Sequence, residues 1–288
     1  MKKIGFVDFY LGEKRACDYF GWITEVSKTL SEAVQCEVAY AWAEQAVSPD
    51  GETSEQWCEK RGVRLCETIE ELCEKSDYII ILSSMAPEKH LCYVEKVFPF
   101  GKNTFVDSPI ATDYETAEKI FEIAKKCDTK FFSASPLRFA RELKFMSDNM
   151  IAVTGGGDNF DEAIFNQAEI AIAIVGRGAD HVRIEAGRDT EADKCGYGVK
   201  IHYPDNRMAT LIYAPVLKYE ILTDVKKMAI RDEFFDILCI EILKFFASGK
   251  LPFNPQETLE IVRITEKLIA GKSTPDVWIP IWDGDKNL

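Results

Sequence analysis

Three apolar runs between residues 77 and 134 constrain the fold of this 288-residue chain more than any other feature. Residues 77–82 (DYIIIL), 103–106 (NTFV) and 131–134 (FFSA) have the length and the β-branched or aromatic content of buried strands. Each run leads into a short polar or proline-bearing loop, and segments with helical spacing separate the runs. Buried strands that alternate with helices are typical of a parallel sheet covered by helices.

The same alternation covers residues 1–134, for which we predict a Rossmann-type parallel-sheet domain. Gly62 is placed to end one helix, and Thr68 with Glu71 forms a capping box that starts the next. Thr112 with Glu115 is expected to cap a helix that runs to about Cys127. The other expected strands are Lys3–Phe9 and Glu37–Trp42, and the other expected helices are Cys17–Leu30, Ser54–Arg61, Ile69–Lys75 and Glu88–Phe98.

Residues 135–288 have a different pattern, for which we predict an α+β domain with a mostly antiparallel sheet. Gly155–Asp158 should be a flexible connector, and little chain separates it from Arg138. The turn residues Pro204–Asn206 favour a hairpin. The expected helices are Ala140–Asn149, Phe160–Val175, Arg231–Ser248 and Asn254–Gly271, and the expected strands are Val182–Ala186, Gly198–Tyr203, Arg207–Tyr213 and Val216–Thr223.

Composition limits the compartment and the partners. Hydrophobic residues make up 47% of the chain and charged residues 29%, as in ordinary globular proteins. No apolar run reaches the roughly 20 residues that cross a bilayer, so no membrane association and a cytoplasmic location are expected. The formal net charge of −13 argues against nucleic acid as a partner, because phosphate binding needs an excess of Lys and Arg.

Nine cysteines are present, but their spacing does not predict a metal site. None forms a C-x-x-C pair, and the chain has only three histidines to complete a ligand set. We therefore interpret the cysteines as reduced core residues and predict no metal.

The loops after the apolar runs resemble those of the glucose–fructose oxidoreductase/inositol dehydrogenase (Gfo/Idh/MocA) family. In that family the middle loop reads Glu-Lys-Pro, whereas this chain has Asp107-Ser108-Pro109. The resemblance covers nearly the whole chain. It implies NAD or NADP as cofactor, a small polar, sugar- or polyol-like ligand, and a homo-oligomer formed through the C-terminal sheet.

The first strand-to-helix turn would hold the dinucleotide pyrophosphate, and a G-x-G-x-x-G pattern would let the backbone approach it. Here Asp8 and Tyr10 take the first two glycine positions, around Phe9, and only Gly12 is nearby. This turn is either purely structural or adapted to an altered nucleotide mode. Ligands of such sheets lie beyond the carboxyl ends of the strands, which adds a second group of predicted cofactor contacts: Ser83, Ser84, Met85, His90 and Pro109. His90 is either a packing residue or a catalyst.

The helix Phe160–Val175 is similar to the family's catalytic helix, whose histidine moves the substrate's proton. Glu162, Asn166 and Glu169 share one face, and Asn166 takes the histidine position. An amide does not titrate near neutrality, so Glu169 and Asp107 are the acid–base candidates if a reaction survives. A solvated polar face is the alternative for the helix, and Arg138 either orients a ligand or bridges the domains.

The substitutions at Asp8, Tyr10, Ser108 and Asn166 fall where the chemistry should be, while the core pattern is intact. We interpret the chain as a divergent oxidoreductase-like protein with NAD(P)-linked chemistry altered or lost. The alternative is a non-catalytic ligand-binding or partner subunit that keeps the dehydrogenase fold.

Overall fold

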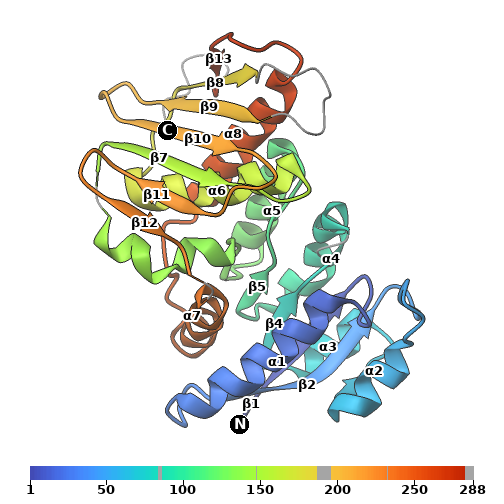
Figure 1. Cartoon of the computed structure of the whole chain (residues 1–288). Coiled ribbons are helices and arrows are strands. Elements are labelled where there is room, and N and C mark those ends of the chain that lie inside the picture. Colours follow the sequence, from blue (N-terminus) through green and yellow to red (C-terminus); the bar gives the residue numbers. More distant parts are fainter. Residues whose placement is uncertain (84–85, 147, 187–195, 232, 283–288) are drawn as a thin grey trace. The chain divides into compact units, whose positions relative to one another are not determined.

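The computed structural model describes residues 1–288 apart from 84–85, 147, 187–195, 232 and 283–288 (Figure 1). The chain divides into two compact units. The first comprises Met1–Ala134 and Phe235–Pro255, and the second comprises Ser135–Phe234 and Gln256–Leu288. Within the described residues, no helix is long and apolar enough to span a membrane.

The first unit is built on a parallel sheet whose strands lie in the order β3-β2-β1-β4-β5-β6. The chain runs outward from β1 to β3 and then crosses back to β4, so the carboxyl ends of β1 and β4 lie side by side where the direction reverses. This order confirms the predicted Rossmann-type sheet. The strands are β1 (Lys2–Asp8), β2 (Cys36–Ala43), β3 (Arg64–Leu65), β4 (Tyr78–Ile81), β5 (Thr104–Val106) and β6 (Phe131–Phe132), and the helices between them are α1 (Lys14–Thr29), α2 (Ser54–Arg61), α3 (Ile69–Lys75), α4 (His90–Val97) and α5 (Tyr114–Lys126).

Local sequence signals set most helix ends in this unit. Gly62 ends α2 in the left-handed conformation (φ 67°), and the Thr68 side chain accepts a hydrogen bond from the Glu71 N–H at the start of α3. The predicted cap of α5 is wrong by one residue. Asp113, not Thr112, is the N-cap, because its carboxylate accepts from the backbone of the third helical residue and also faces the helix dipole.

The helix α7 (Phe234–Ser248) packs its aromatic side chains on the first unit, although it follows the second unit's strands in sequence. Phe246 stacks on Tyr78 of β4 with ring centroids 4.8 Å apart, and Phe235 stacks on Trp22 of α1 at 4.2 Å. The sequence division placed residues 235–255 with the second half. The structure groups them with the first unit, because burial of these aromatic rings outweighs chain order.

The second unit has a mixed, mostly antiparallel sheet in the order β12-β11-β7-β10-β9-β8-β13. Only the β10–β7 pair is parallel among the pairs that the described residues form. The fold class predicted from the sequence is therefore confirmed. The strands are β7 (Met150–Gly155), β8 (His181–Ala186), β9 (Tyr197–His202), β10 (Met208–Tyr213), β11 (Glu220–Leu222), β12 (Lys227–Ala229) and β13 (Ile279–Pro280).

The strand β7 corrects the sequence analysis. Residues 140–149 were expected to be helical and Gly155 to begin a connector, but only Arg141–Phe145 forms a 3-10 helix, and Met150–Gly155 is a strand inside the sheet. Ile151 and Val153 alternate with partly exposed neighbours, which is the strand period, yet six residues are too few to decide on their own. Pairing with β10, more than 50 residues later, decides the conformation.

One face of this sheet is covered by α6 (Phe160–Val175) and α8 (Gln256–Gly271), which pack against each other and against the strands (Figure 1). The bounds of α6 and the end of α8 at Gly271 match the predicted ones. Ile164 and Ala168 of α6 and Ile264 of α8 join the core with Val153 and Leu211. The strand side chains that alternate with the core residues point to the opposite face of the sheet, and they include both polar and apolar residues.

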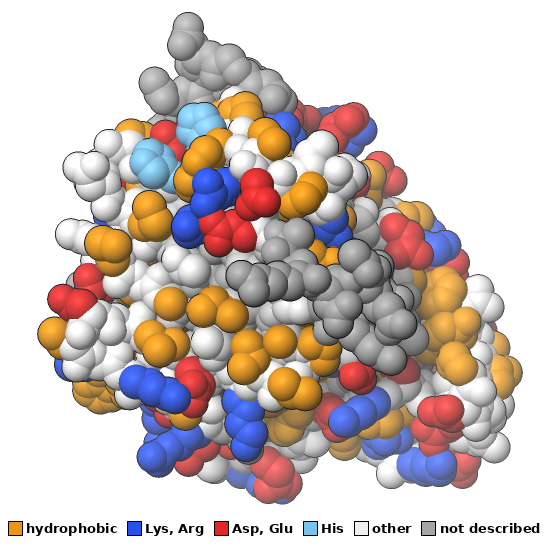
Figure 2. Space-filling view, turned by 45° about the horizontal axis from the view of Figure 1, so that its top comes forward, with side chains coloured by type: hydrophobic (Ala, Val, Ile, Leu, Met, Phe, Trp, Pro, Cys, Tyr) orange, Lys and Arg blue, Asp and Glu red, His pale blue; other side chains and the backbone are white. Residues whose placement is uncertain are grey.

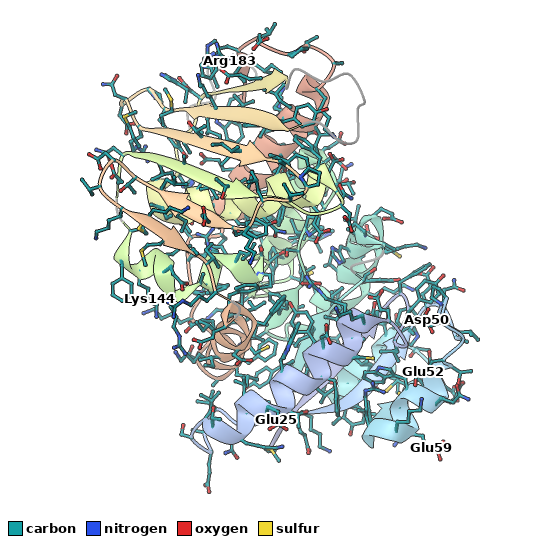
Figure 3. All side chains as sticks on the ribbon, in the orientation of Figure 1. Glu25, Asp50, Glu52, Glu59, Lys144 and Arg183 are labelled. Atoms are coloured by element: carbon teal, nitrogen blue, oxygen red, sulfur yellow. The ribbon has the colours of Figure 1, made fainter. Side chains whose placement is uncertain are left out.

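Many acidic side chains of the first unit lie on its surface. Glu25, Asp50 and Glu59 are exposed on the first unit and extend away from its ribbon (Figure 3). Charged groups of this kind remain hydrated, so they add solubility and little stability.

Candidate functional site

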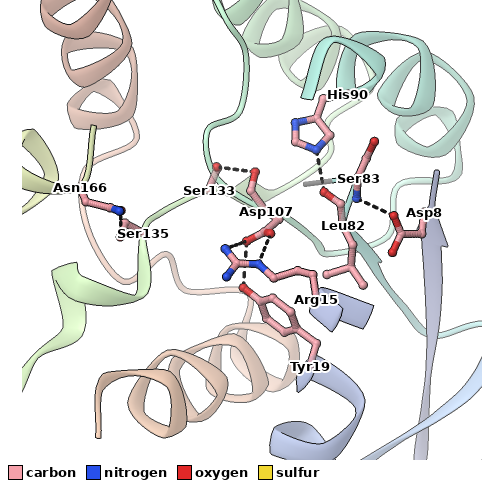
Figure 4. A network of polar contacts seen from close by, with 10 residues as sticks. All are labelled: Asp8, Arg15, Tyr19, Leu82, Ser83, His90, Asp107, Ser133, Ser135 and Asn166. Atoms are coloured by element: carbon pink, nitrogen blue, oxygen red, sulfur yellow. Dashed lines mark hydrogen bonds and ion pairs between the residues drawn. The ribbon is translucent and has the colours of Figure 1, made fainter. Parts of the chain in front are cut away.

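Asp8 ends β1 at the point where a dinucleotide fingerprint would have its first glycine. It is fully buried, and its Oδ1 accepts a hydrogen bond from the backbone N–H of Phe9 at 2.7 Å. The same oxygen accepts from the backbone N–H of Ser83 at 2.9 Å (Figure 4). The carboxyl group thus ties the ends of β1 and β4 together. Its Oδ2 is buried without a partner among the described residues. Burial, with a smaller contribution from Glu13, raises the pKa of Asp8 well above its ordinary value.

The rest of the first turn is filled by the protein itself. Leu11 is fully buried. A Cβ on Gly12 would lie 2.6 Å from the Ser48 Oγ, so the missing side chain makes room for Ser48. Glu13, at the N-cap of α1, is nine-tenths buried and adds a second carboxyl group to the turn. Gly12, the glycine nearest to the expected phosphate-binding turn, therefore serves the packing of Ser48.

An ion pair lies directly after the end of β2, at Glu44. The Glu44 Oε1 lies 2.6 Å from the Lys89 Nζ, and the Tyr93 hydroxyl donates to the Glu44 Oε2 at 2.9 Å. The hydrogen bond from Lys89 lowers the pKa of Glu44. Phe9 and Tyr10 lie edge to face at 4.6 Å, and the Lys89 ammonium lies 5.5 Å from the Phe9 ring. Lys89 and Tyr93 therefore bond to Glu44 at the carboxyl end of β2, where the ribose of a dinucleotide would lie.

Asp107, a predicted acid–base residue, is fully buried at the end of β5 and fully engaged. The Arg15 guanidinium donates to both of its oxygens, at 2.8 and 3.3 Å, and the Tyr19 hydroxyl donates to Oδ1 at 3.0 Å (Figure 4). Arg15 and Tyr19 both come from α1, and the sequence analysis missed them. The only available signal was their position in the first turns of the helix after β1.

The neighbouring loop residues are placed as follows. Ser83 has a left-handed backbone (φ 47°), is buried, and donates its hydroxyl to the Ala86 carbonyl at 2.9 Å. Ser84 and Met85 lie outside the described residues. Ser108 and Pro109 are half-buried directly after Asp107, and Ser108 brings no positive charge to this edge.

His90 is buried between two loops rather than open to a ligand. Its Nε2 lies 2.8 Å from the Leu82 carbonyl and its Nδ1 lies 3.1 Å from the Ile110 carbonyl. Burial lowers the pKa of His90, against the effect of the two carbonyls. These contacts support the packing interpretation, because the ring joins the loops after β4 and β5 and no ring nitrogen is left for a substrate.

In the second unit, Asn166 lies at the centre of a small polar group on α6. The Ser135 hydroxyl donates to its Oδ1 at 2.6 Å (Figure 4), and its Nδ2 donates to the Tyr219 hydroxyl at 3.4 Å. Tyr219 packs against Gly155, where a Cβ would lie 2.5 Å from its ring. Glu162, one turn before Asn166, is exposed. The sequence analysis missed Ser135 and Tyr219, because neither carries a motif.

Glu169, the other acid–base candidate, is held in a buried ion pair. Its Oε2 lies 3.0 Å from the Arg138 Nη1, and its Oε1 accepts from the Ser135 N–H at 3.1 Å. Arg138 also bonds to Glu257 of α8 through Nη2. Burial raises the pKa of Glu169, and the Arg138 charge opposes that rise. Arg138 therefore joins α6 to α8 inside the second unit.

These residues do not fit a dinucleotide pyrophosphate bound in the G-x-G-x-x-G mode. The buried Asp8 carboxyl group takes the first glycine position and accepts the Phe9 and Ser83 N–H groups, so neither N–H is free to bind a phosphate oxygen. Leu11 and the Gly12–Ser48 contact occupy the space that the backbone glycines would leave.

Comparison with solved structures shows the same two-unit fold in dehydrogenases. A putative myo-inositol dehydrogenase from Sinorhizobium meliloti superposes with a TM-score of 0.73 at 13% identity, covering 98% of this chain and 100% of that one. The scyllo-inositol dehydrogenase from Lactobacillus casei with bound NAD(H) and scyllo-inositol gives 0.74 at 14% identity, with 98% and 99% covered. Biliverdin reductase from Synechocystis gives 0.66 at 11% identity, with 93% and 98% covered. No curated protein sequence matches the chain.

The fold is that of a Rossmann unit followed by a unit built on a mostly antiparallel sheet. Residues 23–135 match the model of the oxidoreductase family with an NAD-binding Rossmann fold. The matched segment contains the apolar runs and the loops whose residues resemble the Gfo/Idh/MocA family.

Proposed function

We propose that this protein is a divergent member of the oxidoreductase fold that binds a small polar, sugar- or polyol-like ligand, with NAD(P)-linked hydride transfer altered or lost. The observation that carries the proposal is the Asp8 carboxyl group. It occupies the turn where a pyrophosphate would bind, and it takes the backbone N–H of Ser83 for itself. A cofactor bound in the ordinary mode would have to displace this buried group.

The groups that would handle a proton support the same proposal. Asn166 has no titrating group, and Ser108 has no charge to stabilise a developing anion. Asp107 is held by Arg15, and Glu169 by Arg138. Each carboxylate would have to leave an ion pair before it could act as a base.

The ligand class is supported by the polar group around Asn166 and by the fold's known uses. Asn166 and Tyr219 are partly exposed and offer an amide and a hydroxyl, which match the donors and acceptors of a polyol, while the buried Ser135 hydroxyl holds the Asn166 amide in place. The L. casei structure holds scyllo-inositol together with NAD(H). A small polyhydroxylated ligand at the Asn166 group is therefore the proposal for this chain.

Titration with NAD+, NADH, NADP+ and NADPH, followed by Trp fluorescence, tests the cofactor part. Trp42 is a suitable reporter, because it belongs to β2 and contacts Tyr93 edge to face at 5.8 Å. We expect no saturable change up to about 1 mM, which corresponds to a binding free energy weaker than about −4 kcal/mol. Saturable binding at micromolar cofactor, with oxidation of a polyol, would refute the proposal.

Calorimetric titration with inositols and simple sugars tests the ligand part. We expect binding that Tyr219→Phe weakens, because this change removes the hydroxyl that meets Asn166 and keeps the ring over Gly155. Lys144→Ala, at an exposed position of the same unit, is the matched control and should leave the affinity unchanged. Equal affinity in all three proteins would exclude the Asn166 group as the binding site.

The second candidate function is a partner subunit that associates through the open face of the second sheet. Met150 and Ile212 are 61% and 39% exposed on neighbouring strands of this face, and Ala152, Met208 and Leu222 are their partly exposed neighbours. Apolar side chains also gather on the face seen in Figure 2. We propose that a homo-oligomer forms here. Sedimentation velocity would show it, and Ile212→Lys should shift the protein toward monomer.

A further inference from the structure

Two of the chain's three histidines meet one aspartate at the edge of the second sheet. The Asp180 Oδ1 lies 2.7 Å from the His202 Nδ1, and the Asp180 Oδ2 lies 3.3 Å from the His181 Nδ1. One ligand atom from each residue lies within 4.8 Å of the other two. No other group of three metal-ligating side chains is this close within the part of the chain that the structure describes.

Strand pairing brings these residues together. His181 of β8 and His202 of β9 are direct partners in the antiparallel register, so their side chains emerge on the same face of the sheet. Asp180 precedes β8, and its N–H donates to the His202 carbonyl at 3.0 Å. Figure 2 shows the two histidines close together at the surface. The sequence separates His202 from the other two by more than 20 residues, so no spacing rule could have found the group.

The backbone under Asp180 is fixed from several sides. The buried Glu260 carboxylate accepts from the N–H groups of Gly178 and Ala179 at 2.8 and 2.9 Å. The Trp282 indole N–H donates to the Ala179 carbonyl at 3.1 Å, and the Ile281 N–H donates to the Asp180 carbonyl at 2.8 Å. A side chain mounted on a fixed backbone loses less freedom when it coordinates an ion.

We propose that Asp180, His181 and His202 form a binding site for a divalent transition metal ion, with Zn²⁺ as the best match. Two imidazoles and one carboxylate are a typical three-residue set for zinc, which takes water or another ligand in the fourth position. Bonds of about 2.0–2.1 Å in a tetrahedral arrangement separate the ligand atoms by roughly 3.3 Å. The His181 Nδ1 lies at this distance from the Asp180 Oδ2, whereas the His202 Nδ1 contacts the other oxygen, Oδ1, at 2.7 Å. The three ligand atoms lie within 4.8 Å of one another, so small side-chain movements have to bring them to the tetrahedral spacing.

The surroundings leave the ion an approach from solvent. The three side chains are 44%, 39% and 31% exposed, in the order His181, His202, Asp180. Arg183, which projects from β8 nearby (Figure 3), is bonded to Glu185, so its charge is balanced locally. Neutral imidazole can bind the ion through Nδ1 with its proton on Nε2.

Calorimetric titration of the full-length, tag-free chain with Zn²⁺ tests the site. We expect one ion per chain, and a loss of affinity of at least about tenfold in His202→Ala and in His181→Ala, because each removes a direct ligand. Asp205→Asn, an exposed carboxylate on the β9–β10 turn, is the matched control and should bind like the wild type. Thermal unfolding without metal shows whether each variant is folded. If a histidine variant does not fold, Asp180→Asn is used in its place, because it keeps the shape of the side chain.

Cu²⁺ provides a second readout. The Trp278 ring lies edge to face with His202 at 5.9 Å, so a bound paramagnetic ion should quench its fluorescence. We expect saturable quenching that is lost in Trp278→Phe and in His202→Ala. Zn²⁺ binding that all the ligand variants retain, or no saturable binding up to about 1 mM Zn²⁺, overturns the proposal. These readouts involve no dinucleotide or polyol, so they are independent of the function proposed above.

Discussion

Replacement of Asp8 by asparagine isolates the cost of a buried carboxyl group at the first turn. The Asn Oδ1 can still accept from the Phe9 and Ser83 N–H groups, while the variant can no longer ionise. Burial raises the pKa of Asp8 in the folded chain, so the folded state holds this proton more tightly than the unfolded state does. Stability that comes from this group is therefore present at low pH and is lost as the pH rises from about 4 through the folded-state pKa.

The magnitude follows from linkage. A single group that is protonated only in the folded state lowers the free energy of unfolding by at most about 1.4 kcal/mol per pH unit. We expect the stability of Asp8→Asn minus that of the wild type to increase with this limiting slope from pH 4 upward and to level off above the Asp8 pKa. Urea unfolding at a series of pH values measures the difference, with Asp50→Asn as the control for loss of one carboxylate. A difference that is flat or that falls between pH 4 and pH 8 would refute the reasoning.

Three further substitutions test the packing of the two units. Arg138→Met leaves Glu169 buried without its cation, so we expect a loss of about 3–5 kcal/mol in urea unfolding, with partial recovery when Glu169→Gln is added. Gly12→Ala should cost about 1–3 kcal/mol, because its Cβ meets Ser48, and adding Ser48→Gly should recover part of this. Phe246→Ala should cost about 3–5 kcal/mol, and amide exchange should rise in β4 before it rises in β7, because α7 packs on the first unit. Equal exchange in both strands would contradict that assignment.

Sequence reasoning worked where neighbours along the chain determine the conformation. The helix Phe160–Val175 was predicted with its observed bounds, because its apolar residues recur with the helical period and Gly176 follows. The same reasoning failed at Met150–Gly155, where six residues with a weak alternation become a strand only through pairing with β10. It also failed to assign α7 to the right unit. The aromatic residues of α7 do not reveal their partners in the sequence, and in the structure Phe246 stacks on Tyr78 of the first unit.

The candidate site divides in the same way. Strand ends and substituted positions such as Asp8 and Asn166 could be read directly, because a residue type and its place in a motif are properties of the sequence. The partners could not: Arg15 on Asp107, Tyr219 on Asn166 and His202 on Asp180 lie from more than 20 to more than 90 residues away.

The sequence alone determined the two-part α/β organisation and the residue types at the strand ends and on α6, because both follow from local periodicity and residue identity. Only the tertiary structure decided which carboxylates are paired, which turn is filled and where two histidines meet. Such contacts depend on the register and packing of distant segments, and no local pattern encodes them.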